Sequence, residues 1–133
     1  MRLVFVDTSG FAAAMNARDR HHEEAKAVFR KLAAERGVLV TTNYVRAEAH
    51  ALLLARAGRE LALRFLEERS WAVEWVDRED EKKAMEILRR FRDKDFSLTD
   101  ATSFAVMERL GIREAVSFDR HFSQYGVRTV SAE

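Results

Sequence analysis

The chain has 133 residues, of which 47% are apolar, and its 23 basic and 22 acidic side chains give a formal net charge of +1. A chain of this length buries about two thirds of the surface that it exposes when unfolded, so we expect residues 1–133 to form one domain. The balanced composition excludes a polybasic or disordered chain, and the lack of cysteine excludes disulfides and thiolate metal sites. Apolar runs are too short for a signal peptide or a membrane span, so we expect a cytoplasmic protein with no membrane partner.

Short apolar runs rich in β-forming residues predict about five strands. They lie at residues 3–6, 38–41, 72–76, 114–118 and 127–130. The run LVFV at residues 3–6 is apolar at every position, which is typical of a strand covered on both faces. We therefore expect helices to pack on both sides of the sheet.

Amphipathic patterns predict the helices that separate these strands. Apolar residues recur at intervals of three and four residues between His21 and Glu35, and again from Ala84 to Phe91. Further helices are expected near residues 43–57, 60–69 and 99–110. Glycines at the ends of helical runs, where a residue tolerant of positive φ is favoured, are predicted to end the helices; they are Gly37, Gly58 and Gly111. The alternation of strands and helices predicts an α/β fold with a mainly parallel sheet.

Acidic residues recur where this arrangement places the carboxyl ends of the strands. Asp7 follows the first strand directly, and Asp119 closes the run AVSFD. Asp100 lies at the start of the helix that leads into that later strand, and Glu48 lies about one turn into the helix after residues 38–41. Ligands of open parallel sheets bind outside the carboxyl ends of the strands. We therefore expect the four carboxylates to converge.

Each acid alone also has a structural explanation. An Asp in the first turn of a helix interacts favourably with the helix dipole, and an Asp after a strand often makes a turn. Ser97 or Thr99 could cap the helix that carries Asp100, so we expect that this cap does not need Asp100.

The convergence of four acids favours a functional explanation over a structural one. Two like charges about 4 Å apart repel by about 4 kcal/mol at an effective dielectric of roughly 20, so either protonation or a cation must offset the repulsion. We favour the cation. Oxygen ligands with no adjacent His or Cys favour Mg²⁺ or Mn²⁺ over zinc.

Four segments around these acids resemble PIN-domain ribonucleases, and most closely the VapC toxin group. In chain order they are FVDTS, TTNYVRAEAHALL, SLTDATSFAVMERLGI and SFDRHF. The resemblance implies a PIN-like three-layer α/β/α sandwich with a mainly parallel central sheet of about five strands. It also implies that the family's acidic, metal-binding cluster is formed here by Asp7, Glu48, Asp100 and Asp119.

The same resemblance implies an activity and partners. Thr8 and Thr99 match the family's hydroxyl positions, which orient the carboxylates or a metal-bound water, and Asp95 fits the local pattern unless it is simply a solvated loop residue. The implied activity is the hydrolysis of RNA phosphodiester bonds with one or two Mg²⁺ or Mn²⁺ ions. The implied partners are an RNA substrate, a second copy of the chain in a homodimer, and a small antitoxin protein that blocks the site.

Basic residues must hold the RNA near an acidic site that repels it. Phosphate contacts position a nucleic acid, and arginine is well suited to them. Arg120, directly after Asp119, is the first candidate, although an ion pair between the two is an equal alternative. Arg18, Arg20 and Arg46 are the further candidates.

Two other functions remain open at this point. A PIN-like module that has lost catalysis would bind nucleic acid or protein, and metal-dependent cleavage distinguishes it from an enzyme. A nuclease that acts on DNA would use the same metal chemistry, and a comparison of RNA and DNA substrates of one sequence separates the two.

Overall fold

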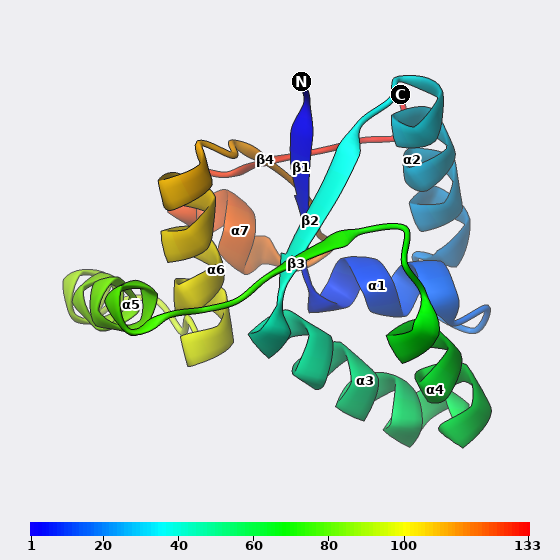
Figure 1. Ribbon diagram of the computed structural model, residues 1–133, viewed down its shortest axis with the longest axis horizontal. Coiled ribbons are helices and arrows are strands. Elements are labelled where there is room, and N and C mark those ends of the chain that lie inside the picture. Colours follow the sequence, from blue (N-terminus) through cyan, green and yellow to red (C-terminus); the bar gives the residue numbers. More distant parts are fainter.

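The computed structural model describes all 133 residues and contains five strands and seven helices (Figure 1). The strands are β1 (Leu3–Val6), β2 (Val38–Thr42), β3 (Ala72–Glu74), β4 (Glu114–Val116) and β5 (Arg128–Thr129). The helices are α1 (Thr8–Met15), α2 (His22–Ala34), α3 (Asn43–Ala57), α4 (Arg59–Glu67), α5 (Arg78–Arg90), α6 (Leu98–Leu110) and α7 (Arg120–Tyr125).

The strands form one sheet in the order β3-β2-β1-β4-β5. Every neighbouring pair is parallel, so the prediction of a mainly parallel sheet of about five strands is confirmed. Val4, Phe5 and Val6 of the central strand β1 are fully buried, because helices cover both faces of the sheet.

The sheet order decides where a ligand can bind. From β1 the chain crosses to β2 and then to β3, and it then returns past β1 to β4 and β5. Right-handed crossovers place the helices of these two halves on opposite faces. Figure 1 accordingly shows α1 to α4 on one side of the sheet and α5 to α7 on the other. The direction changes between β1 and β4, which makes the carboxyl ends of these two strands the expected binding edge.

Helices α1 and α7 are not among the elements predicted above. In α1 the consecutive residues Phe11, Ala12 and Ala13 are all buried, so the helix has no narrow apolar stripe that a periodic pattern could reveal. Helix α7 has only six residues, too few for such a pattern. The predicted strands at 72–76, 114–118 and 127–130 are each longer than the strands that form.

Two of the three predicted glycine caps are confirmed. Gly58 follows α3 with φ 97°, and Gly111 follows α6 with φ 71°. The prediction for Gly37 is wrong, because Arg36 adopts the positive φ of 58° after α2. The backbone N–H of Gly37 then donates to the carbonyl of Leu32 at 2.8 Å, so the helix ends in a Schellman-type turn one residue earlier than predicted.

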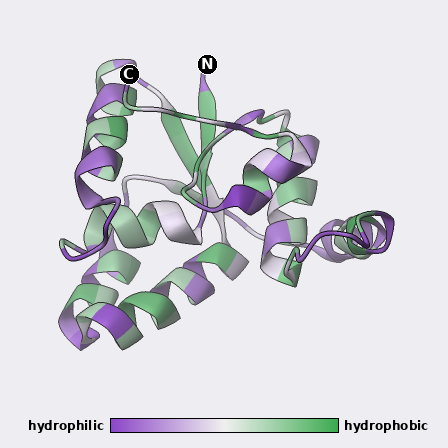
Figure 2. Cartoon of the chain, turned by 180° about the vertical axis from the view of Figure 1, so that it is seen from behind, coloured by the Kyte–Doolittle hydropathy of each residue, from purple (hydrophilic) through white to green (hydrophobic).

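The predicted amphipathic helices are present. Helix α2 buries Ala25, Val28 and Leu32, and α5 buries Ala84 and Ile87. Figure 2 shows mainly hydrophobic colour on the central strands and alternating hydrophobic and hydrophilic colour along the helices. None of the helices combines the length and the apolar character that crossing a membrane requires.

Helix α1 approaches β4 very closely through a glycine. A Cβ atom on Gly10 would lie 2.6 Å from the backbone oxygen of Val116 and 3.1 Å from a side-chain carbon of Val6. Glycine is therefore required at this crossing. The close approach brings the start of α1, where Asp7 lies, against the end of β4.

Candidate active site

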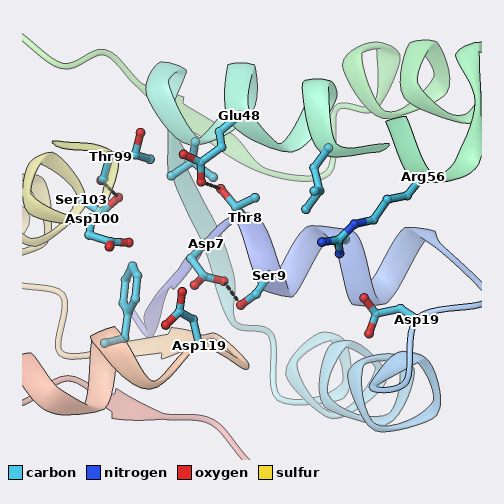
Figure 3. Close-up of a pocket in the computed structure, with 14 residues that line it drawn as sticks. Asp7, Thr8, Ser9, Asp19, Glu48, Arg56, Thr99, Asp100, Ser103 and Asp119 are labelled. Carbon is cyan, nitrogen blue, oxygen red and sulfur yellow. Dashed lines mark hydrogen bonds between the residues drawn. The ribbon is translucent and has the colours of Figure 1, made fainter. Parts of the chain in front are cut away.

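One pocket at the carboxyl edge of the sheet collects the four predicted acids. Asp7, Glu48, Asp100 and Asp119 all line it, although they come from four different parts of the chain (Figure 3). The two predicted hydroxyl residues line it as well; they are Thr8 and Thr99. We call this pocket the acidic pit.

Three of these acids lie at helix N-termini. Asp7 is the N-cap of α1 and accepts a hydrogen bond from the backbone of Gly10, and Asp119 is the N-cap of α7 and accepts one from the backbone of His121. Asp100 is the third residue of α6. The positive ends of three helix dipoles therefore face the pit and reduce the repulsion between the carboxylates.

The expectation that the cap of α6 does not need Asp100 is wrong. Ser97 is the N-cap and accepts from the Asp100 backbone, while Asp100 Oδ2 accepts from the Ser97 backbone N–H at 3.0 Å. The two residues form a capping box. The capping bond uses Oδ2, and Oδ1 makes no hydrogen bond to the protein, so capping and metal binding are compatible roles for this one side chain.

Asp7 is the most buried acid of the pit, with 5% of its surface exposed. Ser117 Oγ donates to Oδ2 at 2.7 Å, and Ser9 Oγ and the Gly10 backbone N–H each donate to Oδ1 at 2.8 Å. Burial nevertheless raises the pKa of Asp7 to about 6, because the desolvation of the carboxylate outweighs these three hydrogen bonds. The charge of Asp119 adds to the upward shift.

Divalent-cation binding should therefore depend on pH. Burial also raises the pKa of Asp100, and a carboxyl group must lose its proton before it can bind a metal. We expect calorimetric titration with Mn²⁺ to give an affinity that falls roughly tenfold per pH unit once the pH drops below about 6. The dependence should be much weaker in Asp7→Asn, and equal affinities at about pH 5 and pH 8 would contradict the burial argument.

A histidine belongs to the same cluster, against the expectation of a site with no adjacent His. His121 Nδ1 lies 2.9 Å from Asp100 Oδ2 and 3.4 Å from Asp119 Oδ1. One potential ligand atom from each of the three residues lies within 4.8 Å of the others. His121 also packs edge-on against Phe96, which fixes its ring. His121 is not among the residues predicted above, because no local pattern links it to Asp100.

The residues of the pit fit a divalent cation. His121 is the one basic side chain within 4.0 Å of any of the four carboxylates, so no Lys or Arg neutralises them. The donor set consists mainly of carboxylate oxygens, which suits a hard cation. Figure 3 shows the side chain of Asp100 pointing across the pit toward Asp7 and Asp119, so these three carboxylates could share one cation.

The hydroxyl residues of the pit have different surroundings. Thr8 Oγ1 donates to Glu48 Oε1 at 2.7 Å, which holds this exposed glutamate toward the pit. The Thr99 hydroxyl has no protein partner, whereas the Thr99 carbonyl accepts from Ser103 Oγ at 2.7 Å. Thr8 therefore orients a carboxylate, and Thr99 leaves a hydroxyl available in the pit.

Two serines that orient Asp7 are not among the predicted residues. Ser9 lies two residues after Asp7, and Ser117 lies 110 positions away in sequence. Ser117 also accepts from the backbone N–H of Asp119 at 3.1 Å, so it links two acids of the pit. The signal available in the sequence was the small polar residue in SFD, two positions before Asp119.

The structure does not bring every predicted residue to the pit. Asp95 is exposed in the segment before α6 and does not line the pocket. Arg46 donates to the carbonyl of Leu66 at 3.1 Å and lines a separate depression near β3. Arg120 is exposed at the start of α7, where it forms no ion pair with Asp119.

The other two predicted arginines lie close to the pit. Arg18 and Arg20 are in the turn between α1 and α2 and line a pocket that shares three residues with the acidic pit. One of the shared residues is Arg56 from the last turn of α3, which was not predicted.

By its fold and its pit the chain is a doubly wound, parallel α/β domain with four carboxylates gathered at the point where the strand order reverses, an arrangement that could bind a divalent cation. Within this class, the family model of the PIN domain matches residues 4–127, and the chain belongs to the PIN-domain family.

The chain is similar to known proteins over almost its whole length. The 23S rRNA-specific endonuclease VapC20 of Mycobacterium tuberculosis is 39% identical over 134 residues, which cover 98% of this chain and 100% of the relative. The crystal structure of that protein, a toxin that cleaves the sarcin-ricin loop, covers 96% of this chain and 98% of its own with a TM-score of 0.87. A toxin–antitoxin complex from Klebsiella pneumoniae has a TM-score of 0.69 over 98% of both chains, and its 13% identity shows the fold alone.

Proposed function

We propose that the chain is an endoribonuclease that hydrolyses RNA phosphodiester bonds with Mg²⁺ or Mn²⁺ and acts as the toxin of a toxin–antitoxin pair. The observation that carries this proposal is a buried acid, Asp7, that shares one pit with Glu48, Asp100 and Asp119 and has no basic partner. The full-length similarity to an RNA endonuclease supports the choice of RNA as the polymer.

The roles of the residues follow from their positions. Asp7, Asp100 and Asp119 would bind the cation directly, and Glu48 would bind it directly or through water, held by Thr8. When bound, the cation stabilises charge on the phosphoryl oxygens and lowers the pKa of water. No side chain needs to act as a nucleophile. The Ser9 and Ser117 hydroxyls keep Asp7 in one orientation.

The substrate that we propose is ribosomal RNA. A relative with 39% identity over the whole chain is specific for 23S rRNA and cleaves its sarcin-ricin loop. We extend this to the present chain as the first RNA to test. The pit supports metal-dependent phosphodiester chemistry, and the choice of ribosomal RNA rests on the similarity.

The partners that we propose are an antitoxin protein and a second copy of the chain. The relative with 39% identity is itself a toxin, and the same fold occurs in a toxin–antitoxin complex from Klebsiella pneumoniae. Trp75, with 70% of its surface exposed beside the edge strand β3, is available for such contacts. Sedimentation of the purified chain with and without the cognate antitoxin tests both.

The test of the activity is cleavage of an RNA that contains the sarcin-ricin loop. We expect cleavage by the purified protein with Mg²⁺ or Mn²⁺, none with chelator, and at least about a hundredfold slower cleavage by Asp100→Asn. Asp93→Asn is the matched control, since its side chain is 75% exposed outside the pit.

Several results would contradict this function. Equal cleavage by Asp100→Asn and the parent would place the active site elsewhere, and faster cleavage of a DNA of the same sequence would reverse the choice of polymer. A lack of cleavage together with a lack of heat on addition of Mn²⁺ would favour the inactive binding module.

A further inference from the structure

A groove lined by arginines leads away from the acidic pit. A second pocket adjoins the pit and shares Ser9, Asp19 and Arg56 with it. A third pocket adjoins the second and shares Asn16, Arg18 and Arg56 with it. We call these two pockets together the arginine groove, after the basic residues that line them, which are Arg18, Arg20, Arg56 and Arg64.

The guanidinium groups of the groove have no carboxylate partners. None of the four arginines forms an ion pair, whereas Arg2 and Arg109 elsewhere each bridge two carboxylates. Figure 3 shows Arg56 reaching into the pocket on the side of Ser9 and Asp19, away from Asp100. An unpaired guanidinium presents a planar set of donors that fits a phosphate. The groove is therefore suited to an anionic chain that enters the pit.

Two aromatic rings form a platform in the same groove. The rings of His21 and Phe118 stack with centroids 4.7 Å apart and an interplanar angle of 11°, and both residues line the groove. Each residue is only partly buried. Bases of single-stranded nucleic acids stack on aromatic side chains, and here a base would stack on an outward face of the pair.

The platform is fixed relative to the acids of the pit. The backbone N–H of Phe118 donates to Ser9 Oγ at 2.8 Å, and Ser9 Oγ donates to Asp7 Oδ1 at 2.8 Å. Phe118 also directly precedes Asp119 in the chain. A base on the platform would therefore be held in a set position relative to two of the acids.

We propose that the arginine groove binds the single-stranded RNA segment next to the cleaved bond, with Arg56 on a phosphate and the His21–Phe118 stack against a base. The placement next to the cleaved bond rests on the function proposed above; the binding itself does not. An acidic peptide would also suit the arginines. RNA fits better because the groove combines unpaired cations with flat rings and opens into the pit.

The test measures RNA binding without cleavage. The parent for this test is the Asp7→Asn protein in chelator, which has less negative charge in the pit. Its affinity for a short, labelled single-stranded RNA is measured by fluorescence anisotropy over a range of salt concentrations. Arg56→Gln should weaken binding and reduce the slope of log affinity against log salt by about 0.7, the value for one lost phosphate contact on a single strand.

The stack is tested separately from the charges. His21→Ala should weaken RNA binding about tenfold, the scale of one lost base stack, while His21→Phe should retain the affinity. With an abasic RNA of the same length, His21→Ala and its parent should bind equally. The imidazole accepts one hydrogen bond, from Arg20 Nε, so the substitution leaves the core intact.

The matched control is Arg30→Gln, which removes the same charge from an exposed position of α2 outside the groove. An equal effect of Arg30→Gln and Arg56→Gln, a loss of abasic RNA binding in His21→Ala, or a lack of RNA binding at low salt would each overturn the inference. Cleavage by the protein with Asp7 intact is scored separately. RNA binding that depends on the groove, without cleavage, would refute the proposed function and support the groove. Cleavage at the same rate in the parent and the groove variants would support the proposed function and refute the groove.

Discussion

Asp7→Asn should lower metal-dependent RNA cleavage at least about a hundredfold and at the same time make the metal-free protein more stable. The loss of activity follows because the carboxylate that would bind the cation is replaced by a neutral amide. The amide can still accept from Ser9 and from the Gly10 backbone, so the local fold is retained. The loss of activity is measured by comparing the cleavage rates of the parent and Asp7→Asn on one RNA with Mg²⁺.

The gain in stability follows from the pKa of the buried carboxyl group. Burial raises the pKa of Asp7 from 3.8 to about 6, so the unfolded chain loses its proton at lower pH than the folded protein does. The folded state is therefore penalised increasingly as the pH rises from about 4 to about 6, and by about 3 kcal/mol above that range. Asp7→Asn removes this penalty, so the metal-free variant should be more stable at about pH 8 and no more stable at about pH 3.

Thermal or urea unfolding in chelator at the two pH values measures the effect. Addition of Mn²⁺ should reduce the difference in stability between Asp7→Asn and the parent, because the cation stabilises the folded parent by binding its carboxylates. Asp93→Asn controls for the loss of a carboxylate outside the pit. A variant that is less stable than the parent at about pH 8 would show that the hydrogen bonds from Ser9 and Ser117 outweigh desolvation.

Gly10→Ala should destabilise the protein by at least about 2 kcal/mol, although alanine is the better helix former. The added Cβ would lie 2.6 Å from the backbone oxygen of Val116, which cannot move without disturbing β4. Helix α1 would have to shift away from the sheet, and the shift would carry Asp7 away from Asp119. The variant should therefore also lose metal affinity when it remains folded.

Urea unfolding measures the stability, and Gly37→Ala is the matched control. A Cβ at Gly37 would meet its nearest neighbour at 3.4 Å, and the φ of this residue is not positive, so we expect a change within about 1 kcal/mol. A Gly10→Ala protein as stable as the parent would mean that α1 and β4 are farther apart in solution.

The acids of the site could be predicted because their local sequence places them. Asp7 and Asp119 each follow an apolar run, and parallel strands end at a common edge. Glu48 and Asp100 were expected at the same edge because each lies near the start of a helix, and the family resemblance implied the same four acids. The structure brings all four into one pit. The exact ends of the strands could be predicted less well, since β4 ends at Val116 and two residues separate it from Asp119.

The residues that the sequence did not predict make contacts over long separations. Ser117 and Asp7 are 110 positions apart, and His121 and Asp100 are 21 positions apart. Arg56 lies at the far end of α3, eight residues after Glu48, and reaches the pit only because α3 packs beside α1. Such partners are set by the order of strands in the sheet and not by local spacing.

The parallel α/β architecture could be predicted from the residues alone, because continuous apolar runs separated by amphipathic helices can bury their side chains in few other ways. The carboxylates that are candidates for binding a metal could be predicted in the same way. The packing of the folded chain was needed to show that Asp7 is buried enough to raise its pKa, that His121 joins the cluster, and that Arg46 lies outside the pit. Burial and contact depend on which segments the fold packs together, and a linear pattern does not contain that information.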